Sequence, residues 1–293
     1  MTATFTAAVP ELGREAGDAI GDVLKRALDG APVAQYVEGT PIAWDVIRDG
    51  GWDMLGATED DGGADLDLRD LIEIGKVVGR WLPPIPLTSS IMAKRWSVAA
   101  RSEPGAVSIA VRTPSGRILA PFGATEGVLL IGPDGDLTSA ARTPDDYAPS
   151  LRLAEGGEPS GLGADAAREI AIVWAAEAVG CAERLLDIGV AYVSQRQQFG
   201  QPVGRFQAVK HHLANALIEC QQAESAVLWA GAEPDRATAA LEVAFTSALR
   251  TAELVVQVHG GIGFTWELGL HMYMRHIVAL RQLSLALAAQ AEA

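Results

Sequence analysis

The sequence predicts a mainly α-helical protein with a small β domain in its middle. Apolar residues recur at helical spacing in the first third of the chain and again from about Gly163 onward, and short β-type runs lie between. With 293 residues and 49% hydrophobic content, the chain can bury a large core. We therefore expect a helical domain at 1–104, a truncated β domain at 105–158 and an antiparallel four-helix bundle at 159–293.

A change in the spacing of apolar residues marks the border between the first two domains. Residues 68–79 carry apolar side chains at helical spacing, and Pro83-Pro84 ends that pattern. Short β-type runs follow at 107–111, 116–119 and 127–131, separated by Thr-Pro-Ser-Gly and Gly-Pro-Asp-Gly. These turn signals predict a small sheet with tight connections.

The last domain has the most regular pattern in the sequence. One apolar stripe recurs every seven residues, at Ile172, Val179, Leu186 and Val193. Helical patterning breaks at 199–202, 231–235 and 259–263. Long helices with such short connections predict an antiparallel four-helix bundle.

Charge and composition restrict the classes of partner. The chain has 23 Lys+Arg against 37 Asp+Glu, a net charge of −14, which predicts no binding to nucleic acid or to anionic membranes. The N-terminus lacks a basic signal-peptide start, and no run of about 18 uncharged apolar residues occurs. Cys181 and Cys220 lie in apolar helical patterns, so we expect buried thiols. Together these features predict a cytoplasmic protein.

No metal site is expected. Each of the five histidines lacks a carboxylate or cysteine at ligand spacing: His211, His212, His259, His271 and His276.

Two short stretches are predicted to bind a ligand. One runs from Arg196 through Phe199 to Gln207, and the other is Gln257-Val-His-Gly-Gly-Ile-Gly-Phe264. Each places an arginine fork, an aromatic ring or exposed glycine backbone at the end of a predicted helix. Such groups suit a phosphate-bearing ligand.

These stretches, in their order and spacing, resemble the bundle signatures of the acyl-CoA dehydrogenase family. The similarity rests on residues 192–202, 206–214 and 257–265, with weaker echoes at 59–63 and 79–86. The order of the three domains agrees with it. The resemblance implies α,β-dehydrogenation of an acyl-CoA substrate, with FAD as cofactor and an electron-transfer flavoprotein as acceptor.

In that family FAD lies across a subunit interface, and the bundle signatures contact the flavin seated in the neighbouring subunit. The resemblance implies that Arg196 pairs with the pyrophosphate and that the remaining positions lie along the ADP moiety. These positions are Gln198, Phe199, Phe206, Gln207, Gln257, Val258, His259, Gly260 and Gly261.

The catalytic base of the family is missing. Ser284 stands where the usual glutamate would be, and a serine without a neighbouring base cannot remove an α-proton. The family's other base position falls on the apolar Ile170. Glu169 and Glu267 are weak substitutes, so no catalytic residue is assigned.

The β domain also lacks the segments that hold the flavin ring in family members. The resemblance therefore implies a degenerate subunit that completes the FAD site of a homologous catalytic subunit in an α2β2 heterotetramer. Such enzymes act on steroid side-chain or ring-fragment CoA thioesters in actinobacteria. The abundance of Ala, Gly and Arg is compatible with that source.

Two alternatives remain open at this point. The chain could be a self-sufficient homomeric dehydrogenase whose base is relocated to Glu169 or Glu267. It could also be a non-catalytic helical assembly module that has lost the flavin altogether.

Overall fold

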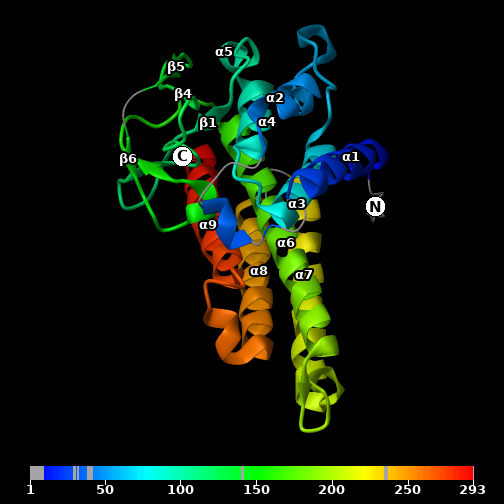
Figure 1. The fold of residues 1–293 in the computed structure, drawn as a ribbon. Coiled ribbons are helices and arrows are strands. Elements are labelled where there is room, and N and C mark those ends of the chain that lie inside the picture. Colours follow the sequence, from blue (N-terminus) through cyan, green and yellow to red (C-terminus); the bar gives the residue numbers. More distant parts are fainter. Residues whose placement is uncertain are drawn as a thin grey trace, which may run out of the picture.

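The computed structural model describes residues 10–28, 31, 33–37, 42–139, 142–233 and 237–292. It confirms the predicted fold class, because long helices flank a small β region (Figure 1). The bundle extends away from the part of the molecule that holds the strands and the first five α-helices. The domain boundaries at 104/105 and 158/159 stay predictions.

The N-terminal part is helical. Its α-helices are α1 (Glu11–Leu28), α2 (Trp44–Asp49), α3 (Leu68–Trp81), α4 (Leu87–Trp96) and α5 (Val98–Arg101), with short 3-10 turns η1 (Val33–Val37), η2 (Trp52–Met54) and η3 (Glu59–Asp61). Helix α3 begins with a capping box, in which the Asp67 side chain accepts from the backbone of Arg69 and Asp70. It ends at the left-handed residue Leu82, directly before Pro83-Pro84, so the predicted helix and its stop are confirmed.

The β region consists of short strands in two sheets. Sheet one has the order β1 (Val107–Ile109), β4 (Leu129–Ile131), β5 (Leu137–Thr138), and sheet two has the order β2 (Val111–Arg112), β3 (Ile118–Ala120), β7 (Ala154–Glu155), β6 (Thr143–Pro144). The three predicted β runs are confirmed. The run 107–111 is divided between the sheets, because β1 pairs in parallel with β4 and β2 pairs in antiparallel fashion with β3.

Four long helices form the C-terminal part: α6 (Ala164–Gln195), α7 (Gln207–Ala232), α8 (Ala237–His259) and α9 (Leu270–Glu292). The hairpin of β8 (Gln197–Gln198) and β9 (Gln201–Pro202), followed by η5 (Val203–Arg205), connects α6 to α7. The turn η7 (Gly260–Phe264) lies between α8 and α9. The break predicted at 231–235 reaches residues 234 and 235, which lie outside the described ranges. Along the predicted stripe, Ile172, Val179 and Val193 are buried and Leu186 is partly buried.

Helices α3 and α6 approach each other through paired glycines. A Cβ placed on Gly79 would lie 1.8 Å from the Glu177 carbonyl oxygen, and one on Gly180 would lie 1.9 Å from the Lys76 carbonyl oxygen. Only glycine fits either position. The N-terminal helices are thereby held against the longest helix of the bundle.

A buried chain of four polar side chains joins α4, η4 (Pro149–Leu151), α6 and α9. Glu177 of α6 accepts a hydrogen bond from Thr88 of α4 at 2.5 Å and contacts His276 Nε2 of α9 at 2.9 Å. His276 Nδ1 lies 2.9 Å from the Ser150 hydroxyl. All four residues are at most 4% exposed. The contact between Glu177 and His276 therefore lies in a fully buried setting.

The polar chain gives a stability prediction. In His276→Leu the Glu177 carboxylate keeps only Thr88, so we expect the free energy of unfolding to fall by about 3 kcal/mol or more. Urea titration followed by circular dichroism measures this loss. Arg281→Leu is the control on the same helix, because it removes an ion pair with Glu242 whose side chains are 39% and 48% exposed. That loss should stay below about 1 kcal/mol, and equal losses in both variants would contradict the assigned role.

The glycine contacts give a second stability prediction. Gly180→Ala should destabilise the protein by about 2 kcal/mol or more, because the added methyl must push α3 away from α6. Gly21→Ala on α1 is the control, since its nearest neighbour, Val77, would lie 3.5 Å from the new Cβ. There the better helix propensity of alanine should leave stability unchanged or raised. Thermal melting compares the two variants. An unchanged melting temperature in Gly180→Ala would show that the helices can separate freely.

Candidate cofactor half-site

Both predicted ligand-binding stretches lie at the end of the bundle that is far from the β region of strands β1 to β7 (Figure 1). Helix α6 ends at Gln195, a two-residue hairpin turn follows, and α7 starts at Gln207. The backbone N–H of Val203 donates to the Arg196 carbonyl at 2.8 Å and closes this hairpin. Helix α8 ends beside it at His259, where Gly260 takes the left-handed φ of 62° that stops the helix.

The hairpin turn is strained and presents an aromatic ring. Phe199 has φ 51° and Gly200 has φ 78°, which is the pattern of a type I′ turn. A bulky residue in this region is unfavourable, and such strain clusters at ligand-binding sites. The Phe199 side chain is 91% exposed and meets the Phe206 ring edge-to-face at 6.1 Å. The turn therefore holds an aromatic surface out into solvent.

A ring stack joins the last turn of α6, just before the first stretch, to the second stretch. Tyr192 and His259 lie with ring centroids 4.3 Å apart and an interplanar angle of 22°. His259 Nδ1 also lies 2.8 Å from the Val255 carbonyl oxygen. Segments about sixty residues apart in the sequence thus form one surface, as the resemblance requires.

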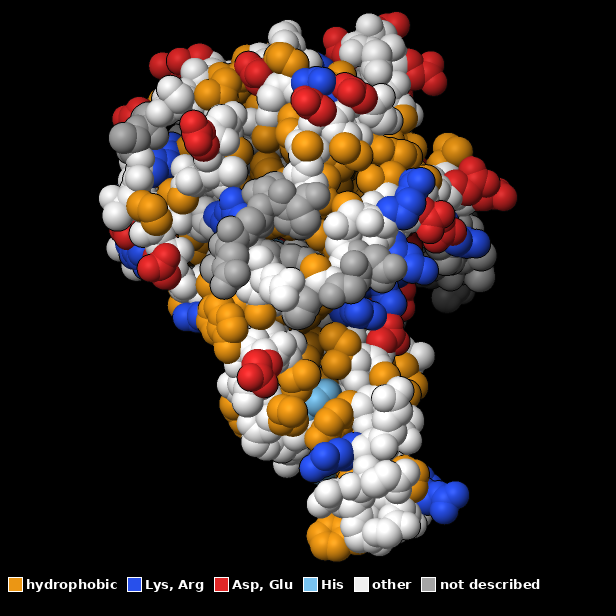
Figure 2. Space-filling model, viewed as in Figure 1, with side chains coloured by type: hydrophobic (Ala, Val, Ile, Leu, Met, Phe, Trp, Pro, Cys, Tyr) orange, Lys and Arg blue, Asp and Glu red, His pale blue; other side chains and the backbone are white. Residues whose placement is uncertain are grey.

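This end of the bundle is cationic although the chain is strongly acidic. No Asp or Glu occurs from Ile188 to Ile218, a segment that carries Arg196, Arg205 and Lys210. Within the described part of the chain, none of these three side chains has an ion pair or a hydrogen bond. The lowest part of the face in Figure 2 carries blue side chains and no red ones. Unpaired local cations can hold an anion that the net charge would repel.

The structure makes most of the predicted cofactor-binding residues accessible. Seven of them are exposed: Arg196, Gln198, Phe199, Gln207, Gln257, Gly260 and Gly261. Phe206 and Val258 are half-buried. His259 is only 4% exposed, so its side chain faces the bundle and its backbone alone borders the surface. A Cβ on Gly260 or Gly261 would have no neighbour within 4 Å, which leaves their backbone open to a ligand.

The position of the missing base lies in the protein core. Ser284 is fully buried in the middle of α9, and its Oγ has no partner among the described residues. Backbone N–H groups in mid-helix already donate to carbonyls four residues earlier, so they cannot bind a ligand. Ile170 is likewise fully buried.

The two candidate substitute bases are placed differently. The Glu169 carboxylate pairs with Arg95 Nε at 2.7 Å and accepts from Trp96 Nε1 at 3.2 Å. Glu267 is exposed in the turn between η7 and α9. Four cavities in the described part of the chain have none of Ser284, Glu169 and Glu267 in their walls.

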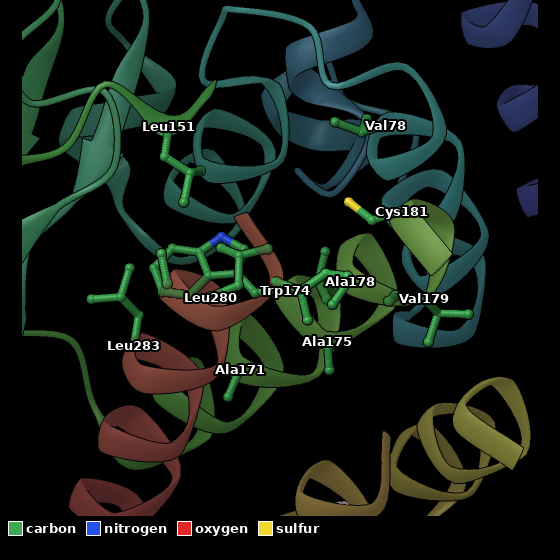
Figure 3. Close-up of a cluster of buried hydrophobic side chains, with 14 of the residues drawn as sticks. Val78, Leu151, Ala171, Trp174, Ala175, Ala178, Val179, Cys181, Leu280 and Leu283 are labelled. Atoms are coloured by element: carbon green, nitrogen blue, oxygen red, sulfur yellow. The ribbon is translucent and has the colours of Figure 1, made fainter. Parts of the chain in front are cut away.

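Apolar side chains fill the space between α6, α9 and the β region. Figure 3 shows Trp174 of α6 among Leu280 and Leu283 of α9, with Leu151 approaching from the β region. Trp174 is 1% exposed, and the three leucines are 1–2% exposed or fully buried. The chain's own side chains therefore fill this space.

Sequence reasoning missed the polar chain around Glu177. Its signal was available, because Glu177 is the one charged residue between Ile170 and Cys181. A carboxylate inside such an apolar helix must find a partner. Its partner His276 lies 99 residues further on, so the sequence pattern did not identify it.

The described residues contain no group of three or more His, Cys, Asp or Glu that could hold a metal ion. Among the helices described, none combines the length and apolarity needed to cross a membrane.

Comparisons with known proteins identify the family. Residues 168–283 match the model of the acyl-CoA dehydrogenase C-terminal domain. Acyl-CoA dehydrogenase IpdE2 of Mycobacterium tuberculosis is 33% identical over 243 residues, which cover 77% of this chain and 76% of that protein.

Two solved structures share the fold. The steroid acyl-CoA dehydrogenase Tcur3481-Tcur3483 matches with a TM-score of 0.76 and 21% identity, covering 97% of this chain and 98% of that one. The ChsE4-ChsE5 complex from Mycobacterium tuberculosis matches with a TM-score of 0.75 and 19% identity, covering 98% and 96%. The fold and the sequence identity to IpdE2 show that this chain belongs to the acyl-CoA dehydrogenase family of flavoprotein oxidoreductases.

Proposed function

We propose that this chain is the non-catalytic subunit of a FAD-dependent acyl-CoA dehydrogenase and supplies the ADP half of a FAD site to a homologous catalytic subunit. One observation carries the proposal. The cationic end of the bundle is exposed and unpaired, whereas the position of the family's base, Ser284, lies in the packed core.

The residues at the end of the bundle fit an ADP group. Arg196 would pair with the pyrophosphate, because its guanidinium has no acidic partner among the described residues and matches two phosphate oxygens at once. Gly260 and Gly261 would let backbone N–H groups approach, since no side chain of their own intervenes. Phe199 and Phe206 would pack beside the adenosine, and the side chains of Gln198, Gln207 and Gln257 would donate hydrogen bonds.

The residues around Ser284 do not fit the flavin-ring end of FAD. Helix α9 is unbroken from Leu270 to Glu292, so no free backbone donors face the β region at Ser284. Trp174 and the leucines of Figure 3 fill the space between α6, α9 and the β region, where we infer that a ring would otherwise lie. When bound, FAD accepts a hydride, and in this proposal that chemistry takes place in the partner subunit.

The proposal extends to the assembly and the substrate. A half-site on one chain requires a second chain, and we infer an α2β2 heterotetramer in which the partner provides the base and the flavin-ring pocket. The steroid acyl-CoA dehydrogenase with the same fold supports a steroid side-chain or ring-fragment CoA thioester as substrate. An electron-transfer flavoprotein would be the acceptor, and we infer a cytoplasmic location.

Expression of the chain alone and with its genomic neighbour separates the proposal from its alternatives. The proposal predicts flavin absorbance and turnover only in the co-expressed complex. A homomeric enzyme would bind flavin alone, and its turnover would be lost in Glu169→Gln or Glu267→Gln. The pairing of Glu169 with Arg95 and Trp96 disfavours that outcome. A purely structural module would yield a colourless complex.

The role of Arg196 gives a direct prediction. In the co-expressed complex, Arg196→Ala should weaken FAD binding by about tenfold or more, because a charge-assisted contact to the pyrophosphate is lost. FAD retained after desalting, measured by absorbance, checks this, and size-exclusion mass should show an intact tetramer. Arg14→Ala is the control, since Arg14 is another exposed arginine without a described partner and lies on α1, away from this end of the bundle. Equal retention in both variants would refute the assigned contact.

The packed core around Ser284 gives another prediction. Ser284→Glu restores the family's residue type, yet we expect no gain in turnover and a lower melting temperature, because a carboxylate would be buried without a partner. Gln282→Glu is the control on the same helix, as Gln282 is exposed and should tolerate the charge. Steady-state assays and thermal melting of both complexes test this. New turnover in Ser284→Glu would mean that the chain holds an active site of its own.

A further inference from the structure

The proposed half-site is built from two exposed segments on different helices, and their relative position must be fixed for both to reach one ligand. Arg196 follows α6, and Gly260 follows α8. Among the described residues, no hydrogen bond joins the two segments directly. Their separation therefore depends on what packs between the last turns of α6 and α8.

Tyr192 is the residue that contacts both sides. Its backbone carbonyl accepts the N–H of Arg196 at 2.9 Å, so it fixes the start of the first segment. Its ring stacks on His259, the residue directly before Gly260, at 4.3 Å. One side chain thus connects the arginine to the glycine pair.

The orientation of His259 makes this contact specific. Its Nδ1 lies 2.8 Å from the Val255 carbonyl oxygen on its own helix, and the side chain is buried. This contact fixes the imidazole on its own helix, and the face of the ring stacks on Tyr192. Among the described residues the Tyr192 hydroxyl has no hydrogen bond, so the ring and not the hydroxyl makes the contact.

We propose that Tyr192 is a positioning residue of the half-site: its stack on His259 sets the spacing between the Arg196 guanidinium and the Gly260-Gly261 backbone. The proposal rests on the proposed function. Tyr192 itself need not contact FAD. It acts by holding the guanidinium and the glycine backbone at a spacing that lets both reach the same pyrophosphate.

The test uses the co-expressed complex, stripped of flavin and titrated with FAD. Tyr192→Leu should raise the Kd for FAD about tenfold, the factor that corresponds to the loss of a well-formed aromatic pair. Tyr192→Phe should bind as the unaltered complex does, because it keeps the ring. Tyr147→Leu is the control: this tyrosine of the β region lies under the guanidinium of Arg275 on α9 and is 44% exposed. Its Kd should not change.

A double variant separates positioning from a general loss of structure. If Tyr192 acts through Arg196, the effect of Arg196→Ala should be much smaller in the Tyr192→Leu background than alone. Additive effects would overturn the proposal, as would an unchanged Kd in Tyr192→Leu. If Tyr192→Leu fails to fold, His259→Leu removes the same stack from the other side and should raise the Kd similarly.

Failure of the positioning role can be told apart from failure of the half-site. An unchanged Kd for FAD in Arg196→Ala would refute the half-site itself. A Kd that is raised in Arg196→Ala and unchanged in Tyr192→Leu would refute only the positioning role.

Discussion

The buried carboxylate of Glu177 is the constraint on which the architecture depends. It lies in the middle of α6, which packs against α3, α7, α8 and α9. A carboxylate there is tolerated only if it finds hydrogen-bond partners. Glu177 accepts from the Thr88 hydroxyl and contacts His276 Nε2, and the Ser150 hydroxyl contacts His276 Nδ1. The N-terminal helices, the β region and the last helix are thus tied to one point.

That arrangement bears directly on function. His276 and Ser284 lie on α9 two turns apart, on the same face of the helix. The helix must stay continuous and closely packed to bring His276 to Glu177, and a continuous helix offers no free backbone donors at Ser284. Trp174 extends the same packing toward the β region. In the proposed function, the interactions that hold the three regions together would occupy the place of a flavin-ring pocket.

Local signals in the sequence predicted most of the fold. Helical spacing at 68–79 and the prolines after Trp81 predicted α3, and short β-type runs predicted the strands β1 to β4. Contacts between distant residues were beyond this reasoning. The inward rotation of His259 depends on Val255 and Tyr192 together, and apolar periodicity carries no information about such partners. For the same reason, the burial of the His259 side chain could not be predicted from the sequence.

The two halves of a FAD site make opposite demands on a protein, so a chain could keep one half and lose the other, as we propose here. A pyrophosphate needs only exposed donors, and the end of the bundle provides them without any cavity in the core. A flavin ring needs a shaped cavity, which competes with core packing for the same volume. In the proposed subunit, Trp174 and the leucines would fill that cavity and stabilise the core, while Arg196, Gly260 and Gly261 lie at the other end of the bundle. Physical separation along α6 would thus allow a ring pocket to disappear while a surface for a neighbour's ADP group persists.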